Sequence, residues 1–265
     1  MRRQAFVMTP AEACASIGGW MLIVSLLIYP LFKDMADSAF ASLAETPYLI
    51  ALGLLKGFGF WGMNFAGQTV RKTSNSSAGF YSFICIGLIA IGNSIFGEEL
   101  SVFQWGSVVV LTLTGLYFTF RGHLNTQPFF IQLMFMAMVS IGCMFGMIDH
   151  YFLTHANWYG LLLLTGVGMT FSSCVLGRMP LRGVARCVLG RQTMCIGILL
   201  AFSEVMILSI LVTHLPVTLA WVAMALVGPV VMVISSLLWG EGRWQEQLLV
   251  GGISYAAAIP IAIGM

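Results

Sequence analysis

Long apolar runs separated by short polar connections fill this chain from end to end. Bounded by charged residues, prolines or polar clusters, the runs predict nine membrane spans, at residues 11–32, 47–70, 76–96, 101–120, 128–149, 157–177, 192–213, 216–239 and 244–264. The stretch 33–45 carries three acidic residues and is predicted to be a loop. The pattern therefore predicts an all-α, polytopic membrane helix bundle.

A polar turn recurs at corresponding places in the two halves of the chain. Phe96-Gly97-Glu98 ends one apolar run and Trp239-Gly240-Glu241 ends another, and in each copy a glutamine, Gln104 or Gln247, follows seven residues after the glycine. Each glutamine precedes or begins a further apolar run. Such recurrence is typical of an internally duplicated transporter.

Composition narrows the class of protein. Hydrophobic residues make up 59% of the chain and charged residues 8%, and the mean hydropathy is +0.93, whereas soluble domains carry about 25% charged residues. A net charge of +2 gives no reason to expect a nucleic-acid partner. The six cysteines include no C-x-x-C pair, and no P-loop or catalytic constellation is visible, so we predict no metal site, no cofactor and no enzyme activity.

The basic residues gather on one side of the predicted bundle. Alternate connections receive the pairs at 2–3 and 71–72, Arg121, and four arginines between 178 and 191, whereas the opposite connections are mostly acidic. Because basic connections stay in the cytoplasm, the N-terminus is predicted to be cytoplasmic and the C-terminus to be outside, in a membrane of the bacterial inner-membrane type. The connection 177–191 shows no regular apolar stripe, so we attribute its arginines to this orientation rather than to an interfacial helix.

Two ionisable residues lie deep inside predicted spans. Lys56 belongs to the span 47–70 and Glu204 to the span 192–213, and they precede Gly97 and Gly240 by 41 and 36 residues. A charge at the centre of a membrane helix costs about 2.5–3.5 kcal/mol, so such residues usually have a function or a partner. Two interpretations stay open: a substrate or proton site, and an ion pair between Lys56 and Glu204 that only joins the two halves.

Three further polar residues follow Lys56 on the same predicted helix. Trp61, Asn64 and Gln68 are spaced by three and four residues, which places them along one face or its edges. They predict a polar, aromatic lining beside Lys56, with Asn64 favoured over Trp61 because an amide in lipid needs a hydrogen-bond partner.

A few polar residues are assigned structural roles. Asp149, His150 and His155 lie at the edge of a span and are predicted to belong to a loop or to the membrane interface. Glu98 is expected to cap the helix that follows it in the chain. Gln104 is expected to hydrogen-bond to a neighbouring helix.

The repeated stretches resemble the ends of EamA-type repeats of the drug/metabolite transporter superfamily. The resemblance rests on Pro216 to Ala220, Gly228-Pro229-Val230 and Ser235 to Glu241 with Gln247, and in the first half on Thr73 to Ala78, Phe96-Gly97-Glu98, Gln104 and Gly106. It implies two inverted repeats, at residues 1–121 with four visible helices and 122–265 with five. The first repeat is one helix shorter than in the family, and the charges imply the opposite orientation.

The resemblance also implies a function. It suggests a secondary transporter that moves a small amino-acid-like, zwitterionic or amine compound by alternating access, with possible coupling to protons. Tyr81, Asn93 and Ser203 then become candidates, because they lie on helices that line the pathway in the family. The alternative is a non-transporting membrane subunit or scaffold of the same fold. Both a homo-oligomer and a partner subunit stay open.

Overall fold

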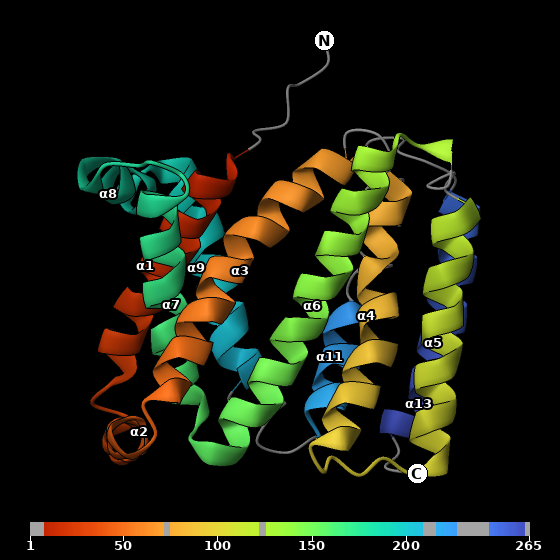
Figure 1. The fold of residues 1–265 in the computed structure, drawn as a ribbon, viewed down its shortest axis with the longest axis horizontal. Coiled ribbons are helices and arrows are strands. Elements are labelled where there is room, and N and C mark those ends of the chain that lie inside the picture. The colour runs from red at the N-terminus through yellow and green to blue at the C-terminus, as the bar shows by residue number, and fades with distance from the viewer. Residues whose placement is uncertain (1–7, 72–74, 122–125, 209–215, 227–243, 263–265) are drawn as a thin grey trace. The chain divides into compact units, whose positions relative to one another are not determined.

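The computed structural model describes residues 8–71, 75–121, 126–208, 216–226 and 244–262 (Figure 1). Within these ranges the chain is helical and contains no strand. It divides into two compact units, one formed by residues 1–65 and 148–213 and the other by residues 66–147 and 214–265. Each unit takes residues from both sides of residue 121. The two predicted sequence repeats, 1–121 and 122–265, are not tested by this division.

The first unit contains α1 (Pro10–Ile28), α2 (Lys33–Glu45), most of α3 (Tyr48–Arg71), the end of α6 (Phe129–His155), α7 (Trp158–Val175), α8 (Leu181–Leu189) and α9 (Arg191–Met206). α1 packs against α7, α8 and α9. Its start is fixed by a capping box, in which the Glu12 amide donates to Thr9 Oγ1 at 3.2 Å and the Thr9 amide donates to Glu12 Oε2 at 2.8 Å.

The second unit contains α4 (Asn75–Ile95), α5 (Val102–Arg121), α11 (Val217–Ala225) and α13 (Trp244–Ala262), with the end of α3 and most of α6. Figure 1 shows α4 beside α5, and α5 also packs against α13. A buried apolar cluster joins α4, α5 and α11; its members are Phe83, Ile86, Ala90, Val108, Leu111, Leu219, Val222 and Ala225.

Described helices occupy all or part of each of the nine ranges predicted from the apolar pattern. Four described helices, α1, α3, α6 and α7, are long and apolar enough to cross a membrane, and α8 with α9 makes a fifth if this bent pair is one span. By length and composition these are the helices of a polytopic integral membrane protein. The rest of the predicted span 216–239 and the turn Trp239-Gly240-Glu241 lie outside the described residues.

The prediction of a loop at 33–45 is wrong, because these residues form α2. Ala36, Ala39 and Leu43 recur at helical spacing and are buried, whereas Asp34 and Asp37 stay exposed on the other face. α2 packs against α7, and the Asn157 side chain, which caps α7, also donates to the Met35 carbonyl at 2.8 Å. The acidic residues that suggested a loop thus belong to the polar face of a short amphipathic helix.

Close approach between helices depends on glycine in the first unit. A Cβ at Gly57 of α3 would lie 2.6 Å from the backbone of Gly168 in α7, and one at Gly53 would lie 2.5 Å from Leu164 Cβ. Glycines at four-residue spacing therefore let α3 and α7 approach closely.

Candidate functional site

A salt bridge between Lys56 and Asp149 lies inside the first unit. Lys56 Nζ is 2.5 Å from Asp149 Oδ1, and the two side chains are 4% and 6% exposed. Lys56 comes from α3 and Asp149 from the last two turns of α6. Gly57, which follows Lys56 directly in α3, is in close contact with Gly168 of α7.

Glu204 is the third ionisable residue of this cluster. It lies near the end of α9, is half-buried, and is within electrostatic range of both Lys56 and Asp149. Its backbone carbonyl accepts from the Ile207 amide, but in the described part of the chain its carboxylate has neither a hydrogen bond nor a salt bridge. With all three groups ionised, the cluster of Lys56, Asp149 and Glu204 carries one net negative charge. We call these three residues the ionisable cluster.

The cluster corrects the expected partner of Lys56. The sequence suggested an ion pair between Lys56 and Glu204, but the salt bridge in the described part of the chain joins Lys56 to Asp149. A charged pair enclosed by apolar helices is stable only with close contact between its members, and Asp149 supplies that contact.

Asp149 and His150 were expected in a loop or at the membrane interface. The expectation of a loop is wrong, whereas the structure does not test the position relative to the membrane. Both belong to α6, which continues to His155, and both are buried. The signal was present in the sequence, because Tyr151, Phe152 and Leu153 extend the apolar run beyond the aspartate. His155 is exposed at the end of the helix, where its ring stacks on Tyr151.

The remaining candidates of the first unit are Trp61, Asn64 and Ser203. Trp61 Nε1 is buried without a hydrogen-bond partner in the described structure, and its ring stacks on Phe65 at a centroid distance of 5.5 Å. The Asn64 side chain donates to the Phe60 carbonyl of its own helix at 2.8 Å. Ser203 is exposed next to Glu204. The amide expected to seek a ligand therefore has a local partner, whereas the indole N–H is a donor that a ligand could satisfy.

The candidates Gln68, Tyr81 and Asn93 belong to the second unit, whereas the ionisable cluster belongs to the first. Gln68 and Tyr81 are half-buried. Asn93 is fully buried and its Nδ2 donates to Thr218 Oγ1 at 3.2 Å. The Asn93 side chain therefore joins α4 to α11.

Glu98 also contacts Thr218. The Thr218 amide donates to Glu98 Oε1 at 2.9 Å, and the hydroxyl donates to Oε2 at 2.5 Å. Thr218 lies in the first turn of α11, so Glu98 caps α11. The prediction that Glu98 caps the helix that follows it in the chain is therefore wrong.

The helix that directly follows Glu98 has a separate cap. Directly before α5 the Ser101 amide donates to Gln104 Oε1 at 2.8 Å, and the Gln104 amide donates to Ser101 Oγ at 3.3 Å, which is a capping box. This local role replaces the predicted bond from Gln104 to a neighbouring helix. The sequence thus identified Glu98 as a capping residue but assigned it to the wrong helix, and it did not predict that Gln104 caps its own helix.

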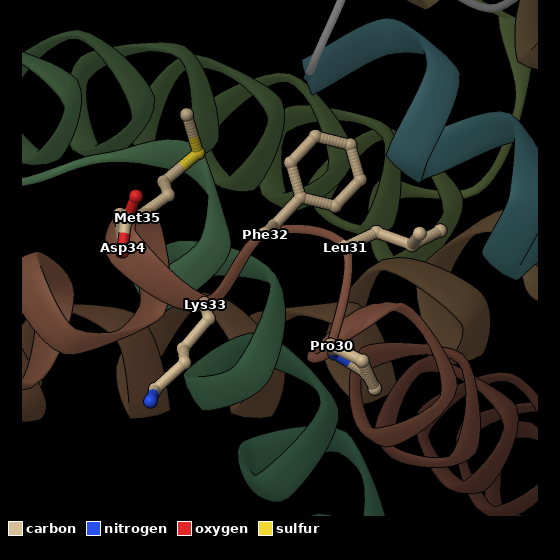
Figure 2. A pocket seen from close by; sticks show the side chains of 6 residues that line it. All are labelled: Pro30, Leu31, Phe32, Lys33, Asp34 and Met35. Atoms are coloured by element: carbon tan, nitrogen blue, oxygen red, sulfur yellow. The ribbon is translucent and has the colours of Figure 1, made fainter.

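An open pocket of about 430 Å³ lies at the turn between α1 and α2. Figure 2 shows its lining, which consists of Pro30, Leu31, Phe32, Lys33, Asp34 and Met35. None of the predicted site residues belongs to it. Within the described ranges, no group of three His, Cys, Asp or Glu side chains is arranged to hold a metal ion.

Comparison with known proteins adds no family assignment. No protein-family model matches the chain, and no curated protein matches it significantly. The functional conclusion therefore depends on the residues and their arrangement.

Proposed function

We propose that this protein is a secondary membrane transporter that moves a small amine-bearing metabolite, amino-acid-like or otherwise zwitterionic, by alternating access. In this proposal nine spans form two EamA-like inverted repeats of four and five helices. The observation that carries it is the ionisable cluster: one basic and two acidic residues on three apolar helices, with the salt bridge enclosed between α3 and α6.

The energetics of the cluster favour a functional role over a purely structural one. A buried ion pair rarely stabilises a protein more than apolar residues of the same volume would, because desolvation of both charges offsets their attraction. Membrane helices retain such groups mainly along substrate or proton pathways. Lys56 and Asp149 already neutralise one another, so Glu204 is the group left to receive a cation.

The net charge of the cluster indicates the ligand. A protonated amine or a proton neutralises the single excess negative charge, and Glu204 is the half-buried acid that a ligand could reach. A substrate carboxylate would lie toward Lys56. Glu204 would bind either a proton or a substrate amine, but not both at once. This competition would couple transport of the amine to movement of protons in the opposite direction.

A thermal-shift screen of the purified protein tests this proposal. Amino acids, polyamines, nucleosides and sugars would be added in turn, and a ligand at 100 times its Kd stabilises the folded state by about 2.7 kcal/mol. We expect stabilisation by an amine-bearing class, and its loss in Glu204→Gln and Lys56→Gln. Glu45→Gln and Lys33→Gln, which change exposed residues of α2, are the matched controls.

Two results would contradict the proposal. One is a stabilising ligand whose effect is unchanged in Glu204→Gln and Lys56→Gln. The other is the absence of any stabilising ligand together with purification of a stoichiometric partner protein, which would favour the subunit or scaffold alternative. Uptake of the stabilising compound into proteoliposomes under a proton gradient would then test the coupling directly.

The proposed location is the bacterial inner membrane, with the N-terminus in the cytoplasm and the C-terminus outside. Single cysteines at Glu99 and Ala185, which are both exposed, would test this orientation by labelling in intact cells. An impermeant maleimide should react at 99 and not at 185. The reverse pattern would show that the charge rule fails for this chain.

A further inference from the structure

The basic connection after α7 contains an amphipathic helix, α8, that is fixed to the first unit by one face. Val184, Cys187 and Val188 are buried against α1. The Trp20 indole donates to the Val188 carbonyl at 2.9 Å, and Val188 packs so closely on Gly19 that an added Cβ there would lie 2.4 Å from its Cγ2. The prediction that the connection 177–191 has no apolar stripe is therefore wrong: the stripe is present and α1 buries it.

A second apolar stripe of α8 has no cover in the described structure. Leu181 is 79% exposed and Leu189 is 73% exposed. At 100° per residue, this stripe of Leu181, Ala185 and Leu189 covers an arc of about 80°, which adjoins the arc of the buried residues but does not overlap it. A single exposed leucine needs no explanation, but two on one edge of a nine-residue helix form an apolar stripe.

Arginines border this stripe. Arg182 and Arg186 lie at about 100° and 140° on the same helical projection, directly beside Leu189. Arg178 and Arg191 flank the helix, and all four side chains are exposed. No acidic residue occurs between Arg178 and Arg191. The carboxylate of Glu12, which lies within electrostatic range of Cys187, is bound in the capping box with Thr9.

The orientation of α8 suits the surface of a membrane. α8 is bent by 81° from the residues Thr193–Met206 of α9, and Figure 1 shows it lying across the direction of that helix. If α9 crosses the bilayer, α8 lies nearly parallel to its plane. A re-entrant position in the hydrocarbon would bury Arg182 and Arg186 at high cost, whereas at the surface they reach water and headgroups.

We propose that α8 and its flanking arginines bind anionic phospholipid, with Leu181 and Leu189 in the acyl boundary and Arg178, Arg182, Arg186 and Arg191 on the phosphates. Charge complementarity identifies the occupant: four guanidinium groups beside an apolar edge fit a lipid that is both anionic and apolar. This inference does not depend on the proposed transport function. It holds equally for a non-transporting subunit.

Lipid exchange on the purified full-length protein tests the proposal. The protein would be equilibrated in detergent micelles containing equal amounts of phosphatidylglycerol and phosphatidylcholine, repurified, and its bound lipids quantified by mass spectrometry. We expect a preference for phosphatidylglycerol that falls in Arg182→Gln/Arg186→Gln. At about fivefold per basic residue near the surface, the double variant should lose up to about 30-fold in preference.

Two matched variants show whether the effect belongs to α8. Arg182→Lys/Arg186→Lys keeps the charge and should retain most of the preference. Arg71→Gln/Lys72→Gln removes the same charge from another predicted cytoplasmic connection and should behave as the wild type. Equal losses in the α8 and control variants, or no preference in the wild type, would overturn the proposal.

Two measurements on the wild-type protein keep the test decisive if the double glutamine variant does not fold. Raising the salt concentration from 0.1 M to 1 M shortens the Debye length from about 10 Å to about 3 Å and should weaken the preference. Millimolar glycerol 1-phosphate, a soluble headgroup without acyl chains, should not displace the lipid. Displacement by this compound would indicate a phosphate site in place of a lipid surface.

Discussion

Replacement of Asp149 by asparagine leaves the Lys56 ammonium without its ion-pair partner in an apolar environment. The two side chains are 4% and 6% exposed and their charged atoms are 2.5 Å apart, so little water replaces the lost carboxylate charge. Breaking a buried pair by removing one member costs about 3–5 kcal/mol. Glu204 is within electrostatic range of Lys56 and should reduce this cost, so we expect a value near the lower limit.

Thermal unfolding in detergent measures the effect. For a chain of this size about 1 kcal/mol corresponds to roughly 2–4 °C in Tm, so Asp149→Asn should lower Tm by roughly 6–12 °C. The exposed Asp37→Asn on α2 is the matched control, and we expect a change within about 0.5 kcal/mol.

Double variants separate the ion pair from the general effect of substitution. In Lys56→Gln/Asp149→Asn both charges are gone, so the double variant should be more stable than Asp149→Asn alone. In Asp149→Asn/Glu204→Gln both acids are gone, and stability should fall below that of either single variant. An unchanged Tm in Asp149→Asn would refute the assignment of a buried pair. So would a Tm of Lys56→Gln/Asp149→Asn that is no higher than the Tm of Asp149→Asn.

Two further stability predictions follow from contacts elsewhere in the structure. Glu98→Gln should lower the free energy of unfolding by about 1–3 kcal/mol, because it removes the charge-assisted cap of α11. Glu99→Gln changes the exposed neighbouring residue and should be nearly neutral. Equal effects of the two substitutions would contradict the cap. Gly57→Ala should destabilise the protein by about 1–3 kcal/mol, because the added Cβ meets the backbone of α7. Gly106→Ala is the control and should be neutral or stabilising, because its added Cβ has no contact within 4 Å. Both effects are measured as shifts in Tm. A tolerated Gly57→Ala would show that α3 and α7 are not in close contact.

The helices of this protein could be predicted from local sequence because their signals are local. Runs of apolar residues of about twenty, ended by charge or proline, gave positions that α1, α3, α4 and α5 match within a few residues. The failures at α2 and α8 have one cause. Both are short amphipathic helices in which charged residues occupy the exposed face, and a search for long apolar runs does not detect them.

The site could be predicted only in part. Lys56 and Glu204 are conspicuous because each is an ionisable residue inside an apolar run. Asp149 was assigned to a loop or the membrane interface because it is the last residue of a predicted span, where a carboxylate usually meets water. Its pairing with Lys56 spans 93 positions in the chain and depends on how α3 and α6 pack.

The sequence by itself therefore determined that this is a helical membrane protein, where most of its helices lie, and which charges are unusual. Hydrophobicity and helix capping act over a few residues, so these properties can be read along the chain. The tertiary structure decided which groups meet: Asp149 rather than Glu204 at Lys56, Glu98 at α11 rather than at α5, and Val188 of α8 against Gly19 of α1. These contacts join residues far apart in the sequence, and helix packing alone determines them.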